Sequence, residues 1–221
     1  MHIPDGILPL PVTAGALAAT IGLTAAAITK IKRMPDPREG IPRAALFTAA
    51  FFILSTIHIP IPPTSVHLML SGLLGVMLGY YAMPAVVIAI FLQAVMLGHG
   101  GLTTIGVNAI IIGLPALLCG WFYRWMRPTA LRRGNRSHLG LAFAIGTFGS
   151  ALAVVIFVMT ILLFMPVYID ASAERAALLT LMLVHTPLVL VEGLFCAWLV
   201  HYFQRTNPEL LCGSVAGNSV P

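Results

Sequence analysis

Residues 139–165 read LGLAFAIGTFGSALAVVIFVMTILLFM, without a single Lys, Arg, Asp or Glu. A helix needs about 20 mainly apolar residues to cross a bilayer, so this stretch predicts a transmembrane helix. Six more apolar segments lie on either side of it, and prolines punctuate their ends. The seven segments cover residues 12–28, 44–57, 66–81, 85–97, 103–121, 139–165 and 177–203. We therefore expect an all-α, polytopic membrane protein with seven transmembrane helices.

The composition of the 221-residue chain excludes several other classes of protein. Hydrophobic residues make up 59% of the chain and charged residues 9%, whereas a soluble domain has about 25% charged residues. A soluble globular enzyme and a disordered chain are therefore excluded. Lys and Arg do not interleave with aromatic residues along one face, so no nucleic-acid partner is expected. The length allows a single transmembrane domain, residues 1–205, followed by a polar C-terminal tail, residues 206–221.

The cationic residues predict the orientation in the membrane. Most Lys and Arg residues lie in segments 30–43 and 124–136, and Arg205 follows the last apolar segment. Cytoplasmic loops are enriched in these residues. If the N-terminus is outside, seven crossings place both basic segments and the C-terminus in the cytoplasm and leave only Arg175 outside. We expect this orientation.

Histidines gather in the segments that this orientation places outside. His2 lies at the start of the chain, His67 ends the loop 58–67, and His99 lies in the loop 98–104. Neither loop contains a Lys, Arg, Asp or Glu. Loops that are rich in histidine and free of charge indicate inward folding over a site rather than full exposure to water.

The first two residues have the groups of a metal chelate. The amine of Met1, the amide nitrogen of His2 and its imidazole Nδ1 can bind one ion in a plane. A deprotonated amide requires a metal that prefers planar nitrogen ligands, which means Ni(II) or Cu(II). One planar position then remains for a distant residue, and the turn signal Pro4-Asp5-Gly6 would fold the N-terminus back. The alternative is a chance histidine after the initiator Met, in an exposed loop.

Four motifs stand out in the chain: Met1-His2-Ile3-Pro4-Asp5-Gly6, Pro63-Thr64-Ser65-Val66-His67-Leu68, Gly98-His99-Gly100-Gly101-Leu102-Thr103-Thr104 and Glu192-Gly193. They resemble the NikM/CbiM family, the substrate-binding membrane subunits of energy-coupling-factor (ECF) transporters for nickel and cobalt. The resemblance covers nearly the whole chain, and the opening hexapeptide and the first histidine loop are its specific parts. The resemblance implies that the ion is bound by the terminal amine of Met1, the amide and imidazole of His2, and the imidazole of His67.

The resemblance also implies the partners and the location. The partners would be an ECF transmembrane coupling protein and two cytoplasmic ATP-binding subunits, with a small accessory membrane subunit as a further candidate. The protein would lie among lipids in the plasma (inner) membrane of a prokaryote. The sequence itself has no G-x-x-x-x-G-K phosphate loop and no H-E-x-x-H or G-x-S-x-G motif, so we expect a transporter subunit and not an enzyme.

Four further residues are expected to support the site or its loops: His99, Asn108, Glu192 and Ser65. His99 lies among glycines that permit close backbone approach, although a histidine facing solvent is an equal alternative. Asn108 is expected to hydrogen-bond across helices. Glu192 is the only acid in a predicted span, where an ionisable residue costs about 2.5–3.5 kcal/mol, so it requires a partner.

Two helix faces of small residues are expected to pack closely against other helices. Ala18, Gly22 and Ala26 share a face of the first predicted helix, which favours docking onto a partner membrane protein. The second face lies on the third predicted helix, where packing within the subunit is expected. It consists of Ser71, Gly75 and Gly79.

The transported ion is expected to be Ni(II), because planar nitrogen geometry favours it, with Co(II) as the alternative. An alternative function is therefore that of a cobalt-binding subunit that serves cobalamin biosynthesis. A vitamin-binding or organic-solute-binding ECF subunit is the main rival, with the histidines used for packing or gating, and a membrane enzyme is a third possibility.

Overall fold

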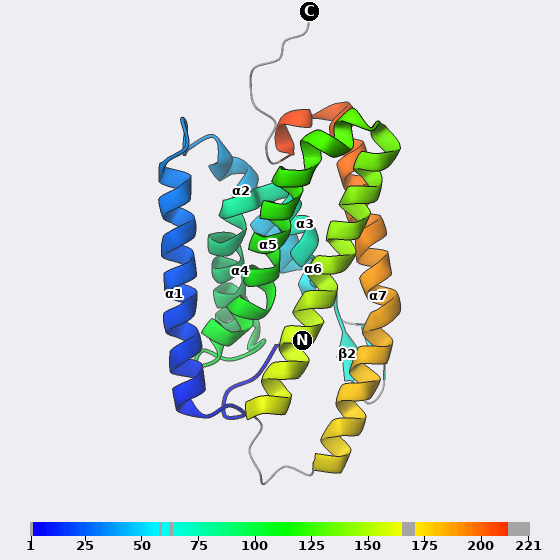
Figure 1. Cartoon of the computed structure of the whole chain (residues 1–221). Coiled ribbons are helices and arrows are strands. Elements are labelled where there is room, and N and C mark those ends of the chain that lie inside the picture. The colour runs from blue at the N-terminus through cyan, green and yellow to red at the C-terminus, as the bar shows by residue number, and fades with distance from the viewer. Residues whose placement is uncertain (1, 58, 62–63, 165–170, 212–221) are drawn as a thin grey trace, which may run out of the picture.

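The computed structural model of the chain consists of helices that pack side by side, with a small β-hairpin near one end of the bundle (Figure 1). It describes residues 2–57, 59–61, 64–164 and 171–211, apart from the side chains of residues 59–61, 64–66, 171–177 and 209. The described α-helices are α1 (Leu10–Lys32), α2 (Gly40–Thr56), α3 (Ser71–Leu78), α4 (Ala82–Leu97), α5 (Ile105–Arg132), α6 (Asn135–Phe164) and α7 (Ala171–Thr206). Strands β1 (Ile59–Ile61) and β2 (Thr64–Val66) pair antiparallel, and the short 3-10 helices are η1 (Gly79–Tyr81) and η2 (Pro208–Leu210).

Five of the described helical segments are long and apolar enough to cross a membrane. They cover Leu10–Lys32, Ser71–Leu97, Ile105–Arg132, Asn135–Phe164 and Leu178–Thr206, and α2 is a shorter apolar helix. The chain is therefore a helical, multi-pass membrane protein, as the sequence predicts. The hairpin is the only strand pair among the described residues, and it falls in a loop.

The segment Ser71–Leu97 is not one straight helix. His67 precedes α3 and His99 follows α4, yet their ring centroids are only 6.0 Å apart. Helix α3 therefore runs away from the histidines, and α4 runs back toward them. Gly79 makes the break between the two helices, with a φ of +57° that favours glycine.

The prediction of seven transmembrane helices is corrected at α3. The predicted segment 66–81 begins in β2, and its helix runs only from Ser71 to Leu78. At about 1.5 Å per residue, eight residues span about 12 Å, less than half of the ~30 Å hydrocarbon core. The hydropathy of the segment marks its burial correctly but not its length, because α3 is covered by protein rather than by lipid.

Helix α3 lies at the centre of the bundle, and all of its residues are buried. A Cβ atom at Gly75 would meet the backbone of Ala116 and Gly120 in α5, and one at Gly72 would meet the backbone of Gly146 in α6. These glycines therefore let three helices approach at backbone distance. The small residues of α3 pack within the subunit, as the sequence predicts.

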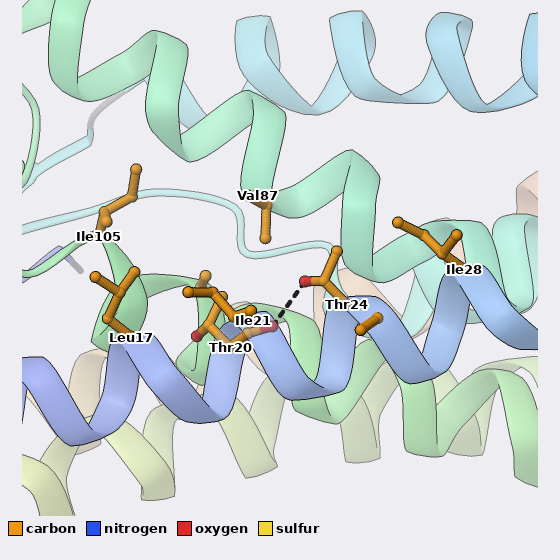
Figure 2. Close-up of a pocket in the computed structure, with 9 residues that line it drawn as sticks. Leu17, Thr20, Ile21, Thr24, Ile28, Val87 and Ile105 are labelled. Atoms are coloured by element: carbon orange, nitrogen blue, oxygen red, sulfur yellow. Dashed lines mark hydrogen bonds between the residues drawn. The ribbon is translucent and has the colours of Figure 1, made fainter.

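Helix α1 lies at the edge of the bundle, and few of its residues are buried: Thr13, Thr20, Ala27 and Ile31. The Thr20 hydroxyl donates a hydrogen bond to the Gly106 carbonyl of α5 at 2.7 Å. An apolar groove of about 350 Å³ is lined by residues of α1, α4 and α5. Figure 2 shows Leu17 and Ile21 of α1 in this groove, with Val87 and Ile105 among its other lining residues.

Candidate metal centre

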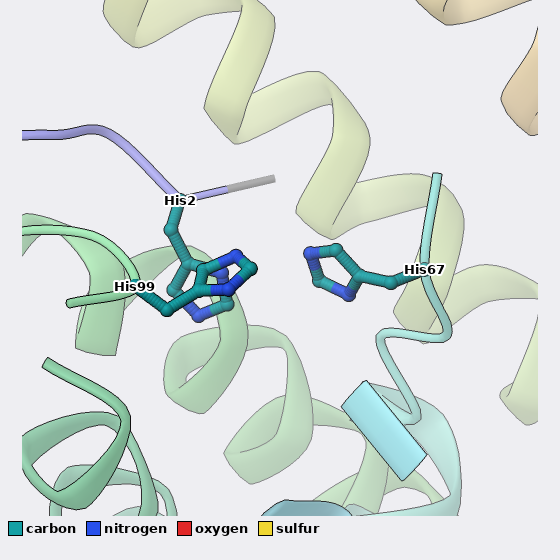
Figure 3. Close-up of side chains that lie close together, drawn as sticks. All are labelled: His2, His67 and His99. Carbon is teal, nitrogen blue, oxygen red and sulfur yellow. The ribbon is translucent and has the colours of Figure 1, made fainter. Parts of the chain in front are cut away.

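Three histidines from three distant segments meet at one point: His2, His67 and His99 (Figure 3). One ring nitrogen from each lies within 4.8 Å of the others. The His2 and His67 rings are stacked, with centroids 5.2 Å apart, whereas the His99 ring meets His2 edge-on at 4.7 Å. His67 is 1% exposed, and the other two are partly buried. This cluster is the one group of three or more possible ligand side chains among the described residues.

The N-terminal segment reaches the cluster because α5 holds its backbone. Ile3 is 1% exposed, and its N–H donates to Asn108 Oδ1 at 2.8 Å. Asn108 Nδ2 donates to the Ile3 carbonyl at 3.1 Å, and the Thr104 hydroxyl donates to the same carbonyl at 2.6 Å. One side chain thus pairs with both backbone groups of Ile3, which fixes the position of the adjacent His2.

Asp5 fastens the same segment to the loop that carries His99. Its carboxylate accepts hydrogen bonds from the Leu102 N–H at 3.1 Å and from the Thr103 N–H at 2.9 Å. The Thr103 hydroxyl donates to it at 2.5 Å. This hydroxyl is the main reason that the pKa of the exposed Asp5 carboxyl lies below its usual range, and it outweighs the opposing effect of desolvation.

Glycines make room for the N-terminal segment on this loop. A Cβ atom at Gly100 would lie 3.0 Å from Asn108 Nδ2 and 3.3 Å from His2 Cβ, and φ at Gly100 is +81°. A Cβ atom at Gly101 would collide with Asp5. The glycines beside His99 therefore permit the close backbone approach that the sequence indicates.

The His67 loop is held from the opposite side by α7. Glu192 is 3% exposed, and its carboxylate accepts hydrogen bonds from the Met69 N–H at 2.6 Å and the Leu70 N–H at 2.9 Å. The Ser150 hydroxyl of α6 donates to the same carboxylate. His67 Nδ1 is hydrogen-bonded to the Leu68 carbonyl at 3.1 Å, and as the donor it leaves the Nε2 lone pair for a metal ion.

The structure brings some of the predicted site residues together and does not describe others. The structure brings together His2, His67 and His99, and it puts Asn108 and Glu192 on the segments beside them. Met1 lies outside the described residues, and so does the side chain of Ser65, whose backbone pairs with Pro60 in the hairpin.

The remaining predicted site residues lie on α1. Ala18, Gly22 and Ala26 are exposed on this helix, and a Cβ atom at Gly22 would meet nothing within 4 Å.

Three supporting residues were missed by sequence reasoning: Asp5, Thr104 and Ser150. Asp5 and Thr104 lie within the quoted motifs, so a search for polar partners of the N-terminal segment would have considered them. Ser150 lies in the uncharged stretch 139–165 and gives no sequence signal.

Among the described residues, the cluster consists of three imidazoles and no carboxylate, which suits a divalent transition metal rather than Ca²⁺ or Mg²⁺, which prefer oxygen ligands. Each of the three segments is also held by its own hydrogen bonds, from Asn108, Asp5 and Glu192. The geometry is that of a prepared nitrogen site at the end of the bundle where the chain begins.

Residues 2–210 match the family model described as "CbiM: Cobalt uptake substrate-specific transmembrane region". The chain is 30% identical to a "Putative metal transport protein" of Haemophilus influenzae, over 96% of this chain and 97% of that protein. It is 32% identical to the "Fused nickel transport protein NikMN" of Rhodobacter capsulatus, over 96% of this chain and 64% of the fused protein.

Among solved structures, the fold is similar to that of a "Truncated Transition metal Transporter". The TM-score is 0.72 at 22% sequence identity, over 92% of this chain and 98% of that chain. A second solved structure, described as a "transition metal transporter", gives a TM-score of 0.71 at 23% identity, over 92% of both chains. At this identity the likeness concerns the fold alone.

Proposed function

Because the chain belongs to the CbiM family of cobalt uptake transmembrane proteins, we propose that it is the substrate-binding membrane component of a nickel or cobalt importer. The observation that carries this proposal is the convergence of His2, His67 and His99 from three separate segments. Imidazoles are ligands for both ions; the matched family model is described for cobalt, and the Rhodobacter capsulatus relative is named for nickel.

The proposed ligands are the terminal amine of Met1, the amide nitrogen and imidazole of His2, and the imidazole of His67. The hydrogen bonds between Asn108 and Ile3 support this ligand set, because they fix the backbone directly after His2. In this proposal His99 contacts the His2 ring edge-on and positions it, rather than binding the ion.

Nickel is the proposed substrate, and cobalt is the alternative. A deprotonated amide together with imidazoles and an amine gives a planar set of nitrogen ligands, which Ni(II) prefers. Cu(II) also favours such a set. Selectivity for Ni(II) over Cu(II) must therefore come from the geometry of the site and the availability of each metal, rather than from affinity alone.

The proposed orientation places the histidine cluster on the outer side of the plasma (inner) membrane of a prokaryote. The two basic segments, 30–43 and 124–136, lie at the opposite end of the bundle from the start of α1 (Figure 1). Trp121, just before the second of them, and Trp125, within it, are exposed on α5, as expected for a membrane interface. In this orientation the seven described α-helices alternate in direction, and α3 runs inward from the histidine cluster without reaching the other end of the bundle.

The proposed partners are an ECF transmembrane coupling protein and two cytoplasmic ATP-binding subunits, with a small accessory membrane subunit as an optional component. The chain carries no phosphate-binding loop, so the energy for movement of the ion would come from these subunits. The exposed face of Ala18, Gly22 and Ala26 on α1 is the proposed docking surface for the coupling protein.

Calorimetric titration of Ni(II) into the purified chain tests the proposal. The native chain should bind tightly, and one residue added before Met1 should abolish this binding because it removes the terminal amine from the chelate. H67A should also lose binding, whereas S55A removes a buried hydroxyl of α2 and should keep it. Equal binding by the native and extended chains would refute the chelate, and absence of binding by the native chain would refute metal capture.

A further inference from the structure

The N-terminal end of α3 has no side-chain cap from its own sequence. The first N–H groups of any α-helix lack partners within the helix, and membrane interiors offer no water to replace them. Leu70, at the N-cap position of α3, has a φ of +53° and no side-chain cap. The helix itself is buried throughout, so its N-terminal end requires an acceptor from elsewhere in the fold.

Glu192 of α7 supplies an acceptor immediately before this end of the helix, at the N-cap residue Leu70 and its predecessor Met69. Its two oxygens accept from the successive N–H groups of Met69 and Leu70, directly before the first helical residue, Ser71. A carboxylate is also the favoured group at a helix N-terminus, because the helix dipole places partial positive charge there. The nearly complete burial of Glu192 is thus matched by three hydrogen-bond donors.

Close packing of α6 against α7 fixes the position of this carboxylate. A Cβ atom at Gly193 would collide with the Thr147 hydroxyl, and one at Gly146 would meet Cys196. The two helices therefore touch directly beside Glu192, and Ser150 of α6 donates to it there. The Glu192 side chain has little freedom to move independently of the α6–α7 pair.

We infer that Glu192 is a positioning residue for His67. Met69, whose N–H it binds, lies two residues after His67, and Leu70 adopts a backbone conformation that few residues other than glycine favour. The carboxylate stabilises this turn, and the turn directs the His67 ring toward His2. This inference rests on the proposed function and extends it, because it makes the metal geometry depend on the packing of α6 against α7.

The test combines metal binding with a measurement that needs no metal. In E192Q, one acceptor oxygen is replaced by an NH₂ group that faces N–H or O–H donors. Ni(II) affinity should fall about 10–100-fold, as is typical when a group that orients a ligand is lost. The visible absorption spectrum of the bound ion should also change, because His67 is displaced. Amide hydrogen exchange at Met69 and Leu70 should accelerate.

Y123F is the matched control. The Tyr123 hydroxyl is hydrogen-bonded to His138 Nε2 at 2.8 Å in a buried site on α5 and α6 near the basic end. Y123F should lower the unfolding temperature but leave the Ni(II) affinity and spectrum unchanged. If E192Q does not fold, S150A serves in its place, with a smaller loss of affinity in the same direction.

The role of Glu192 is overturned if E192Q, or S150A in its place, keeps the native affinity, spectrum and exchange rates. Failure of the native chain to bind Ni(II) would refute the proposed function instead. The exchange rates of Met69 and Leu70 would then still decide whether Glu192 holds the loop.

Discussion

Asn108 of α5 pairs with Ile3 as a neighbouring β-strand would, accepting from its N–H at 2.8 Å and donating to its carbonyl at 3.1 Å. The two residues are separated by more than a hundred positions in the sequence. This pairing turns an irregular N-terminal segment into a fixed part of the fold, and it places His2 beside His99.

Replacement of Asn108 by alanine should release the N-terminal segment. The Ile3 N–H then loses its acceptor in a buried place, which should cost about 1–3 kcal/mol of stability. Ni(II) affinity measured by calorimetry should fall together with the unfolding temperature. S55A, which removes a buried hydrogen bond with Gln93 at 2.5 Å, should lower stability alone. Native affinity in N108A would contradict the proposed role of this residue.

The two loop histidines should behave differently on substitution. H67A removes a proposed ligand and should reduce Ni(II) affinity by more than about 100-fold. H99A removes a residue that orients His2 and should cost only about 10–100-fold. The visible spectrum of Ni(II) bound to H99A should resemble that of the native chain. A spectrum that changes in H99A as much as in H67A would make His99 a ligand.

The contribution of Asp5 to stability should depend on pH. Its pKa is lowered in the folded chain, so the carboxylate stabilises the fold above the ordinary pKa of Asp, about 3.9. This contribution is lost as the pH falls through the lowered pKa. The difference in unfolding temperature between the native chain and D5A should therefore be largest near neutral pH and vanish in acid. A constant difference across this range would show that the carboxylate charge is irrelevant.

Substitutions at Gly22 and at Gly75 should affect different properties: docking onto a partner for Gly22 and stability of the fold for Gly75. Gly22 is exposed, and a Cβ atom added there would meet no described residue within 4 Å, so G22L should keep the native unfolding temperature and Ni(II) affinity. Its co-purification with the coupling protein should weaken, and unchanged co-purification would remove α1 as the docking surface.

G75A is the opposite case, because its Cβ atom would meet the Ala116 carbonyl and the Gly120 backbone. Overpacking of this kind costs about 1–3 kcal/mol, so the unfolding temperature should fall even without any partner present. A native unfolding temperature would show that α3 and α5 can separate slightly without loss of stability.

Much of the fold follows from hydropathy, and the departures have physical causes. The segment predicted over 103–121 continues as α5 to Arg132. Hydropathy marks only its apolar part, but arginine has a high helix propensity, so the helix extends beyond that part. The segment predicted over 66–81 is cut short, because hydropathy does not register the break at Gly79 or the hairpin before His67.

The candidate site is less predictable than the fold. The spacing of Met1 and His2 indicates a chelate that lacks one ligand, but only the resemblance to a family pointed to His67. The sequence also predicts that Glu192 needs a partner. It gives no sign that the partners are the backbone N–H groups of Met69 and Leu70, because main-chain donors have no residue signature.

The central position of α3 has a consequence for biosynthesis. This helix is too short to be held by lipid on its own, and it packs mainly against α5 and α6, which the ribosome produces later. The carboxylate at its N-terminal end belongs to α7, which follows α5 and α6 in the chain. The N-terminal helices must therefore remain in the membrane without these contacts for a time, and competence for ion capture would arise only after α7 has been inserted.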